Sequence, residues 1–378
     1  MKDLVLDGRT LDRLDRWRKA HAVFLRADDP TAERALAQAL GRAWSRGQVY
    51  GRTRRVWVER VASALPDLEQ RLGLLAARVH VSPEDPGQTK WDAVGSLVPL
   101  TLACRQVRSL WFVDVIRSGE FFVEFQPIFD LHSGNPLGFE GLLRALSPDG
   151  TRHLAAEIFP AALVLGIEKA FERASWVAVL EAARRLPESS MLFLNVNPQL
   201  LTGGESGLSG LGEEAERMEF PYARLALDLV EIERVESLEG LQKALSVPHD
   251  LGVSIALDDV TSGYDTLRYC SGLSPRWIKV DSEITRNIAR DAQRRAILQL
   301  LSQVASDSRV ALIAEGIENA EDLSVCVEEG VFAAQGYFLG RPHSEPVEAS
   351  AEFGAWLAAR RARERPGTSA ALPVKTED

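Results

Sequence analysis

From residue 121 onwards, short apolar runs alternate with amphipathic segments of helix length, and this alternation restricts the fold more than any other feature. Segments such as Ala161–Leu186 and Ala292–Ser306 have the length and periodicity of helices. Strands that alternate with helices form a mainly parallel sheet, so the fold class is α/β. Eight such units in this length predict a (β/α)8 barrel. The predicted strands are Phe121–Leu131, Leu137–Leu146, Met191–Val196, Leu225–Val230, Val253–Leu257, Trp277–Val280, Val310–Ile313 and Ala333–Leu339.

The link between the first two predicted strands is atypical of such a barrel. It consists of His132-Ser133-Gly134-Asn135-Pro136, which is too short for the crossover that joins parallel strands. The first strand should therefore run antiparallel to the second. The sequence thus predicts a modified TIM-type barrel with an antiparallel first strand, over residues 101–358.

Residues 1–100 have a different pattern of apolar residues. Leucine and tryptophan recur every three or four positions, as at Leu11, Leu14 and Trp17, and predict a mostly helical N-terminal region. Two interpretations stay open for it: a helical extension packed on the barrel, or a regulatory or interaction domain that binds a protein partner. Residues 359–378 are charged and rich in small residues, which predicts a tail that is partly disordered.

The charges and cysteines exclude several classes of protein. Residues 1–100 carry 17 Lys and Arg against 13 Asp and Glu, whereas the remainder carries 27 against 41. An acidic barrel does not attract DNA by its overall charge. Cys104, Cys270 and Cys326 match neither a zinc pattern nor a disulfide framework, which favours a reducing compartment. Because no signal peptide and no run long enough to span a bilayer is evident, we expect a cytoplasmic protein.

Acidic, amide and lysine side chains recur where the predicted strands end. In isolation, each is better explained as a solvated residue or a helix cap. Their recurrence at one rim matters, because sites of such barrels are built at the C-terminal ends of the strands. An oxygen-rich ring suits Mg²⁺ or Mn²⁺, and two such ions could activate a water for attack on a phosphodiester. The residues are Glu140, Asn195, Asp228, Glu231, Asp258, Asp259, Lys279, Asp281, Glu315, Glu318 and Gln335.

Short motifs at these positions resemble those of the EAL domain family, whose members bind and linearise cyclic di-GMP. The resemblance covers about Phe121 to Pro342, in order and at familiar spacings. The motifs are Phe125-Gln126-Pro127-Ile128, Glu140-Gly141-Leu142-Leu143-Arg144, Asn195-Val196-Asn197-Pro198, Asp228-Leu229-Val230-Glu231, Asp258-Asp259-Val260-Thr261-Ser262-Gly263-Tyr264, Ile278-Lys279-Val280-Asp281, Ala314-Glu315-Gly316-Ile317-Glu318, Gln335-Gly336-Tyr337-Phe338 and Gly340-Arg341-Pro342.

The resemblance implies a role for each residue. Glu315 would be the general base, and Lys279 would orient the attacking water. Glu231 and Glu318 would brace the loop after the fifth strand. It further implies a homodimer through the barrel. The implied metal ligands are Glu140, Asn195, Asp228, Asp258, Asp259 and Glu315. The implied substrate-binding residues are Gln126, Leu143, Arg144, Asp281, Gln335 and Arg341.

Three positions depart from the family pattern. Gly141 stands where Ala is usual, and Asp228 stands where the family has Glu. Val260-Thr261 replaces Phe-Gly in the loop that positions Asp259. The sequence therefore predicts a cyclic di-GMP phosphodiesterase that yields linear pGpG, with activity that the altered loop lowers. The alternatives are a cyclic di-GMP receptor without efficient turnover, an interaction module that has lost the nucleotide, and an unrelated barrel metalloenzyme.

Overall fold

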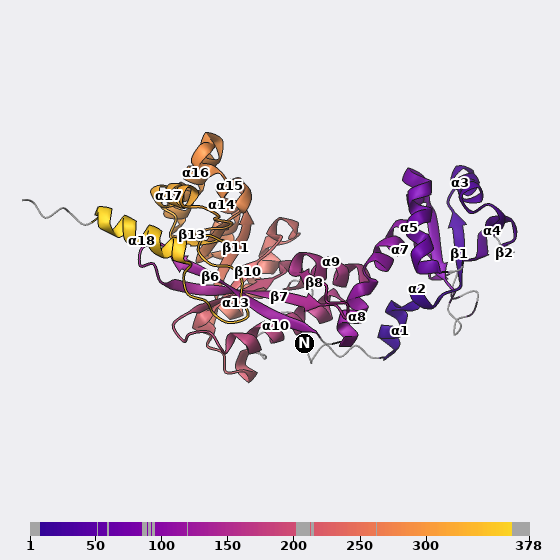
Figure 1. The fold of residues 1–378 in the computed structure, drawn as a ribbon, viewed down its shortest axis with the longest axis horizontal. Helices are drawn as coiled ribbons and strands as arrows, with labels where there is room; N and C mark the ends of the chain where they lie inside the picture. Colours follow the sequence, from indigo (N-terminus) through magenta and orange to yellow (C-terminus); the bar gives the residue numbers. More distant parts are fainter. Residues whose placement is uncertain are drawn as a thin grey trace, which may run out of the picture. The chain divides into compact units, whose positions relative to one another are not determined.

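The chain folds into two compact units, shown in a computed structural model (Figure 1). It describes residues 8–364 except 51, 59, 85–88, 90, 91, 93, 94, 119, 202–211, 213, 214 and 262. The first unit comprises Met1–Phe122 and Arg144–Ser175, and the second comprises Val123–Leu143 and Trp176–Asp378. This division does not coincide with the boundary at residue 100 that the sequence suggests. Most of the predicted tail lies outside the described residues.

The first unit combines helices with a small sheet. Its strands are β1 Ala22–Ala27, β2 Gln48–Tyr50, β3 Thr53–Trp57, β4 Val79–Pro83 and β5 Val98–Pro99, and β8 Arg152–Leu154 pairs with the end of β7. Its helices are α1 Gly8–Leu14, α2 Arg16–Lys19, α3 Pro30–Leu40, α4 Arg42–Ser45, α5 Val61–Leu72, the 3₁₀ helix Gly73–Arg78, α7 Leu100–Arg108, α8 Leu110–Ser118 and α9 Ala155–Leu165.

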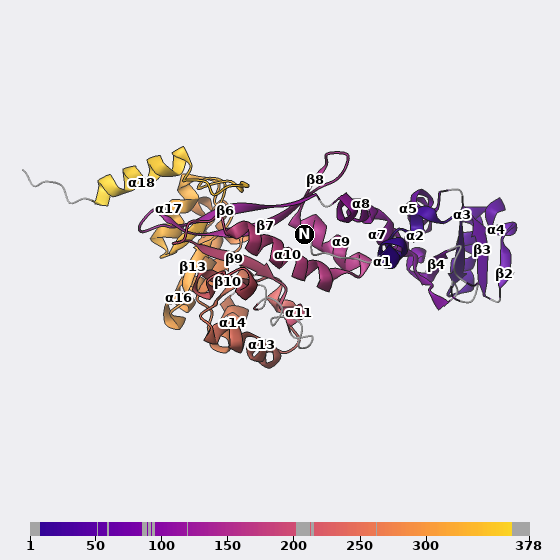
Figure 2. The same cartoon turned by 90° about the horizontal axis from the view of Figure 1, so that it is seen from below.

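The sheet of the first unit is antiparallel, with the strand order β2-β3-β1-β4-β5. Figure 2 labels β2, β3 and β4 of this sheet. Counted with its two long helices, the order β1-α3-β2-β3-α5-β4 is that of a ferredoxin-like unit. Helices do predominate over strands in the described part of residues 1–100, as predicted, but the prediction missed this sheet. Its strands are short, and β3 carries Arg54 and Arg55, so neither an apolar run nor a clean alternation reveals it.

Local sequence signals explain the helix that follows β1. Asp29 caps α3, because its side chain accepts hydrogen bonds from the backbone N–H groups of Thr31 and Ala32, and Pro30 occupies the first turn. Gly41 ends the helix with a positive φ of 52°. Leu36 of α3 is fully buried with Phe24 and Leu25 of β1, which gives this unit a core of its own.

The second unit is a barrel. Its strands are β6 Phe121–Asp130, β7 Pro136–Leu146, β9 Met191–Val196, β10 Leu225–Leu229, β11 Ser254–Val260, β12 Trp277–Val280, β13 Ala311–Ala314 and β14 Ala333–Gln335. Its helices are α10 Glu168–Ala183, α11 Pro198–Leu201, α13 Leu238–Asp250, α14 Gly263–Leu273, α15 Ser282–Thr285, α16 Ala292–Ser308, α17 Ala320–Glu328 and α18 Ala351–Glu364, with 3₁₀ turns at Tyr222–Arg224, Ile232–Arg234 and Ile288–Arg290.

The barrel closes because β6 pairs with β14 on one side and with β7 on the other. From β7 through β9 to β14, successive neighbours are parallel, whereas β6 runs antiparallel to β14. The predicted modified TIM-type barrel with an antiparallel first strand is therefore confirmed. All eight predicted strands are present, and two of them, Met191–Val196 and Trp277–Val280, have the predicted bounds.

One layer of apolar side chains fills the barrel interior. It takes residues from seven of the eight strands, and all of them are buried. Strand residues two apart point the same way, so the next inward-facing layer lies two positions further along each strand. The members of the apolar layer are Ile128, Phe193, Ala226, Ala256, Trp277, Ile313 and Ala333, and Met191 packs with them from two positions before Phe193.

Candidate functional site

The polar site is the layer directly above this apolar layer. On each of six parallel strands, the residue two positions after the member of the apolar layer is polar. On the antiparallel strand β6, the residue two positions before Ile128 is polar as well. Glu140 of β7 completes the set. The inward-facing side chains of the barrel thus change from apolar to polar between one layer and the next. The layer is Gln126, Glu140, Asn195, Asp228, Asp258, Lys279, Glu315 and Gln335.

Lys279 lies at the centre of this layer and is only 1% exposed. Its Nζ atom lies 2.6 Å from Asp228 Oδ2, 2.7 Å from Glu315 Oε1, 2.9 Å from Asp258 Oδ1 and 3.5 Å from Glu140 Oε2. One ammonium group therefore faces four carboxylates. This excess of negative charge in a buried space is what a bound cation would relieve.

Two amide side chains orient Glu140. Asn195 donates from Nδ2 to Glu140 Oε1 at 2.8 Å, and Gln335 donates from Nε2 to Glu140 Oε2 at 2.6 Å. Gln335 also donates to Gln126 Oε1 at 3.2 Å. Both carboxylate oxygens of Glu140 are thus held in place, one by a side chain of the adjacent strand β9 and the other by a side chain of β14, beyond β6.

The carboxyl groups have shifted pKa values for distinct reasons. Burial raises the pKa of Asp228 well above its usual value, and repulsion by Asp258 adds to the shift against the attraction of Lys279. Burial likewise raises the pKa of Asp258 and, strongly, that of Glu315. Burial opposes ionisation of Glu140 too, but attraction by Lys279 and the two amide hydrogen bonds outweigh it and lower its pKa. Such divergent shifts within one cluster are typical of functional sites.

The donor set fits a divalent cation. Among the described residues, carboxylate oxygens of Asp258, Asp259 and Glu315 lie within 4.8 Å of one another. Three buried oxygens of the layer, Asn195 Oδ1, Asp228 Oδ1 and Gln335 Oε1, have no hydrogen-bond partner and are free to act as ligands. Oxygen atoms of this kind suit Mg²⁺ or Mn²⁺.

A β-bulge explains how two consecutive aspartates serve one site. The pairing of β11 with β12 shifts register between Leu257 and Val260, and Asp259 has a positive φ of 54°. A bulge re-aims a side chain that regular alternation would turn to the opposite face. Partial burial, together with Asp258 and Asp281, raises the pKa of Asp259 to about 7.

The layer opens into a cavity of about 370 Å³. Besides residues of the polar layer, its lining includes Tyr337, which belongs to a family motif, and Ser282 and Arg286, which no sequence pattern indicated. Ser282 begins α15 and Arg286 follows the last residue of that helix, so their place at the cavity becomes evident only in the folded chain. Arg286 is paired with Glu318, with Nη2 at 2.9 Å from Oε1.

Other predicted site residues lie apart from this layer. Leu143 is buried in β7, and the guanidinium of Arg341 lies 4.3 Å from the centre of the Tyr337 ring. Asp281 caps α15 by accepting a hydrogen bond from the backbone N–H of Glu283.

Three further assignments stay predictions. Arg144 belongs to the first unit. Glu231 and Glu318 were predicted to brace the loop after the fifth strand. Glu231 forms an ion pair with Arg234 at 2.7 Å, and Glu318 forms one with Arg286. Within the loop itself, residue 262 lies outside the described residues.

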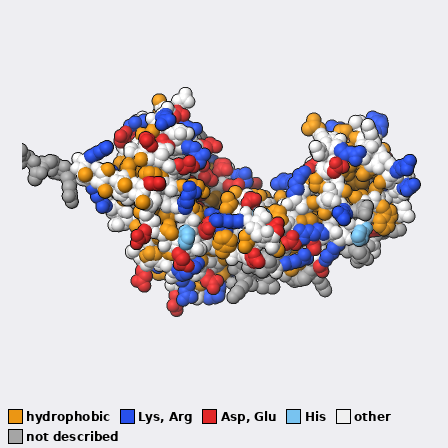
Figure 3. Space-filling view, viewed as in Figure 1, with side chains coloured by type: hydrophobic (Ala, Val, Ile, Leu, Met, Phe, Trp, Pro, Cys, Tyr) orange, Lys and Arg blue, Asp and Glu red, His pale blue; other side chains and the backbone are white. Residues whose placement is uncertain are grey.

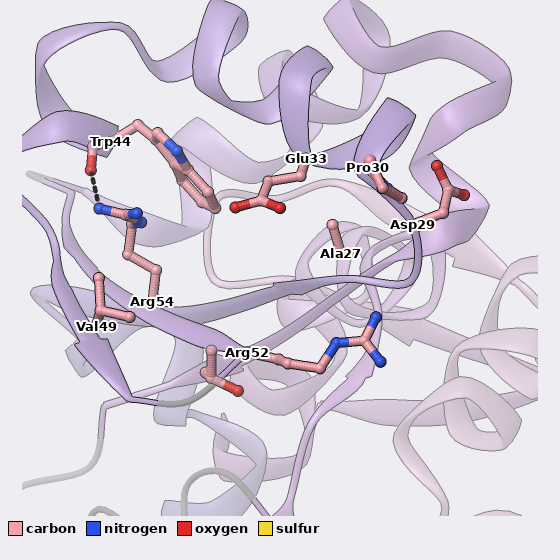
Figure 4. A pocket seen from close by; sticks show the side chains of 9 residues that line it. Ala27, Asp29, Pro30, Glu33, Trp44, Val49, Arg52 and Arg54 are labelled. Atoms are coloured by element: carbon pink, nitrogen blue, oxygen red, sulfur yellow. Dashed lines mark hydrogen bonds between the residues drawn. The ribbon is translucent and has the colours of Figure 1, made fainter.

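The first unit has a cavity of about 330 Å³, but its cations are already engaged (Figure 4). Arg54 lies 4.7 Å from the centre of the Trp44 ring and donates to the Trp44 carbonyl at 3.1 Å. Arg52 donates to the Asp28 carbonyl at 2.9 Å. Elsewhere, acidic and basic side chains are interspersed on the face shown in Figure 3. The polar layer of the barrel is therefore the stronger candidate site.

Fold and site together define the class: a TIM-type barrel with a layer of acidic side chains at its mouth. A sequence model of the EAL domain matches residues 111–342, and the chain belongs to this family. It is 27% identical over 229 residues to a cyclic di-GMP phosphodiesterase of Pseudomonas aeruginosa, PA2567, covering 59% of this chain and 38% of the relative. It is 25% identical over 235 residues to a probable cyclic di-GMP phosphodiesterase of Escherichia coli, PdeG, covering 60% of this chain and 45% of the relative.

Solved structures agree on the fold. A standalone EAL protein of Vibrio cholerae in its c-di-GMP-bound form has a TM-score of 0.53 and 25% identity, covering 62% of this chain and 98% of that one. The Bacillus subtilis YkuI protein in complex with c-di-GMP and calcium has a TM-score of 0.55 and 22% identity, covering 66% and 63%. The chain spans less than half the length of the two curated relatives named above. No helix in the described part of the chain is both long and apolar enough to cross a membrane.

Proposed function

We propose that this protein is a phosphodiesterase specific for cyclic di-GMP, which it hydrolyses to linear pGpG. The observation that carries the proposal is the ring of four carboxylates around Lys279 at the mouth of an EAL-family barrel. Relatives named as cyclic di-GMP phosphodiesterases support the substrate. A cytoplasmic location, a homodimer through the barrel and a protein partner of the N-terminal region stay predictions.

The residues of the site divide into binding and proton-transfer roles. Glu140, Asn195, Asp228, Asp258, Asp259 and Glu315 would hold Mg²⁺ or Mn²⁺. When bound, these ions would polarise the phosphodiester and lower the pKa of a water. Glu315 would accept a proton from that water, and burial suits it to this task because it raises the pKa of its carboxyl group. Lys279 would hold the water in line with the phosphorus. The water oxygen would form a bond to phosphorus while the bond from phosphorus to the leaving ribose oxygen breaks, and that oxygen would take up a proton from solvent.

The second candidate function is a cyclic di-GMP receptor that turns the nucleotide over slowly. Asp259 adopts a positive φ of 54° beside a β-bulge, and Val260-Thr261 follows it in place of the family's Phe-Gly. A ligand misplaced by about 1 Å can reduce the rate roughly a hundredfold without abolishing binding. Low activity is therefore the expected outcome.

The test incubates the full chain with cyclic di-GMP and Mg²⁺ or Mn²⁺ and follows both binding and linear product. Product that requires the metal and disappears in Glu140→Gln supports the phosphodiesterase. The double variant Val260→Phe with Thr261→Gly should raise the rate and leave affinity almost unchanged. Binding without product in both proteins supports the receptor, whereas neither binding nor product from the folded wild type refutes both functions.

A further inference from the structure

The barrel cavity presents a mismatch of charge to the ligand proposed for it. Five of its described lining residues are carboxylic acids, which are Glu140, Asp258, Asp259, Glu315 and Glu318. A cyclic dinucleotide carries a negative charge on each of its two phosphodiester groups. The lining carboxylates therefore repel the phosphodiester groups. Metal ions would compensate this repulsion for the phosphodiester group beside them, whereas the other group needs a cation from the protein.

Only two of the described lining residues are cationic, and they differ in accessibility. Lys279 is 1% exposed and is surrounded by four carboxylates, so it has no room for a further anion. The side chain of Arg286 is 55% exposed and forms a single ion pair with Glu318, which is itself 51% exposed. Ion pairs as exposed as this stabilise a protein little, so Arg286 can leave Glu318 at small cost.

The backbone that carries Arg286 is nevertheless fixed. Arg286 follows α15, and its carbonyl oxygen accepts a hydrogen bond from the guanidinium of Arg294. The next backbone N–H groups are bound by the buried carboxylate of Asp322, from Asn287 at 2.9 Å and from Ala289 at 3.0 Å. A planar guanidinium on a fixed backbone can offer two parallel N–H groups to two phosphate oxygens.

We infer that Arg286 binds a phosphodiester group of the ligand and that Glu318 holds the guanidinium in place until the ligand displaces it. This assignment rests on the proposed function, because the ligand is the cyclic dinucleotide. It also gives Glu318 a role different from bracing the loop after the fifth strand. The described contact of Glu318 is with Arg286.

The experiment titrates cyclic di-GMP into the full-length wild type and into Arg286→Ala, Arg286→Lys and Glu318→Gln. Arg290→Ala is the matched control, because this exposed arginine lies four residues further along the same segment and does not line the cavity. Arg286→Ala should weaken binding roughly tenfold or more, as expected for a lost charge-assisted hydrogen bond. The affinity of Arg286→Lys should lie between those of the wild type and Arg286→Ala, since lysine keeps the charge and loses the paired donors.

Glu318→Gln should strengthen binding, because it removes the competitor for the guanidinium. In steady-state assays the loss at Arg286 should appear in KM, with kcat almost unchanged. Equal affinities in wild type, Arg286→Ala and Arg290→Ala, with all three folded, overturn this assignment alone. A folded wild type that does not bind cyclic di-GMP overturns the proposed function and this assignment with it.

Discussion

The two units differ in where their charged side chains lie. In the barrel, Lys279 is buried among four carboxylates that lie in one closed layer. In the first unit, charges pair near the surface, as in Arg55 with Glu84 at 2.5 Å and Arg18 with Asp114 at 2.6 Å. Burying an ion costs several kcal/mol unless it is well compensated. A fold that keeps an excess of buried carboxylates is therefore preserving a function rather than stability, whereas exposed pairs of opposite charge cost the fold little.

The largest effect should come from removing the central cation. In Lys279→Met, four carboxylates share a buried space without an ammonium group, and we expect a loss of about 3 kcal/mol or more in the free energy of unfolding. Turnover should be lost as well. Urea unfolding in EDTA measures the effect, and added Mg²⁺ should restore part of the stability because it binds only the folded site. A variant as stable as the wild type in EDTA would mean that the lysine does not neutralise this cluster.

A second test concerns the tight packing beside Glu140. A Cβ atom on Gly141 would collide with Cγ1 of Val179 on α10, so the usual Ala of the family has no room here. Gly141→Ala should cost about 1–3 kcal/mol through overpacking, and Val179→Ala should recover much of that loss in the double variant. Thermal unfolding of the four proteins gives the coupling energy.

Gly354 provides the matched control for that substitution. It lies inside α18, and nothing lies within 4 Å of the position that its Cβ would take. Gly354→Ala should therefore stabilise the protein by roughly 0.5–1 kcal/mol, because alanine favours a helix interior. Destabilisation of equal size at both glycines would contradict the role given to Val179.

Removing one negative charge from the polar layer should raise the stability of the folded protein and abolish its turnover. The pKa of Asp258 is raised in the folded protein, so its ionisation above the usual pKa weakens the folded state. Asp258→Asn keeps the shape without the charge. We expect turnover to vanish while the free energy of unfolding in EDTA rises by about 1 kcal/mol. Mg²⁺ should stabilise the variant less than the wild type. A fall in stability in EDTA would show that the attraction of Lys279 outweighs burial.

The barrel was predictable because its strands are buried on both faces and appear as apolar runs with a polar residue near the C-terminal end, as Lys279 in Trp277–Val280. The residues of the polar layer were predicted from their recurrence at the ends of the strands and from family motifs. The sheet of the first unit was not predictable, since a three-residue edge strand such as Gln48–Tyr50 leaves no periodic signal. Arg286 was missed for another reason: its approach to Glu318 joins two loops 32 residues apart, which no local pattern records.

The smallest expected effect comes from the first unit. Arg55 donates from Nε and Nη2 to the two carboxylate oxygens of Glu84, at 2.8 and 2.5 Å. Glu84→Gln removes the charge of this pair, and because the glutamate is 32% exposed we expect a loss of no more than about 1 kcal/mol. If the first unit is a passive extension, cyclic di-GMP turnover in the folded variant should equal that of the wild type. A change in turnover that exceeds the change in stability would instead show that the first unit regulates the barrel, and the separation between a structural unit and a functional one would no longer hold.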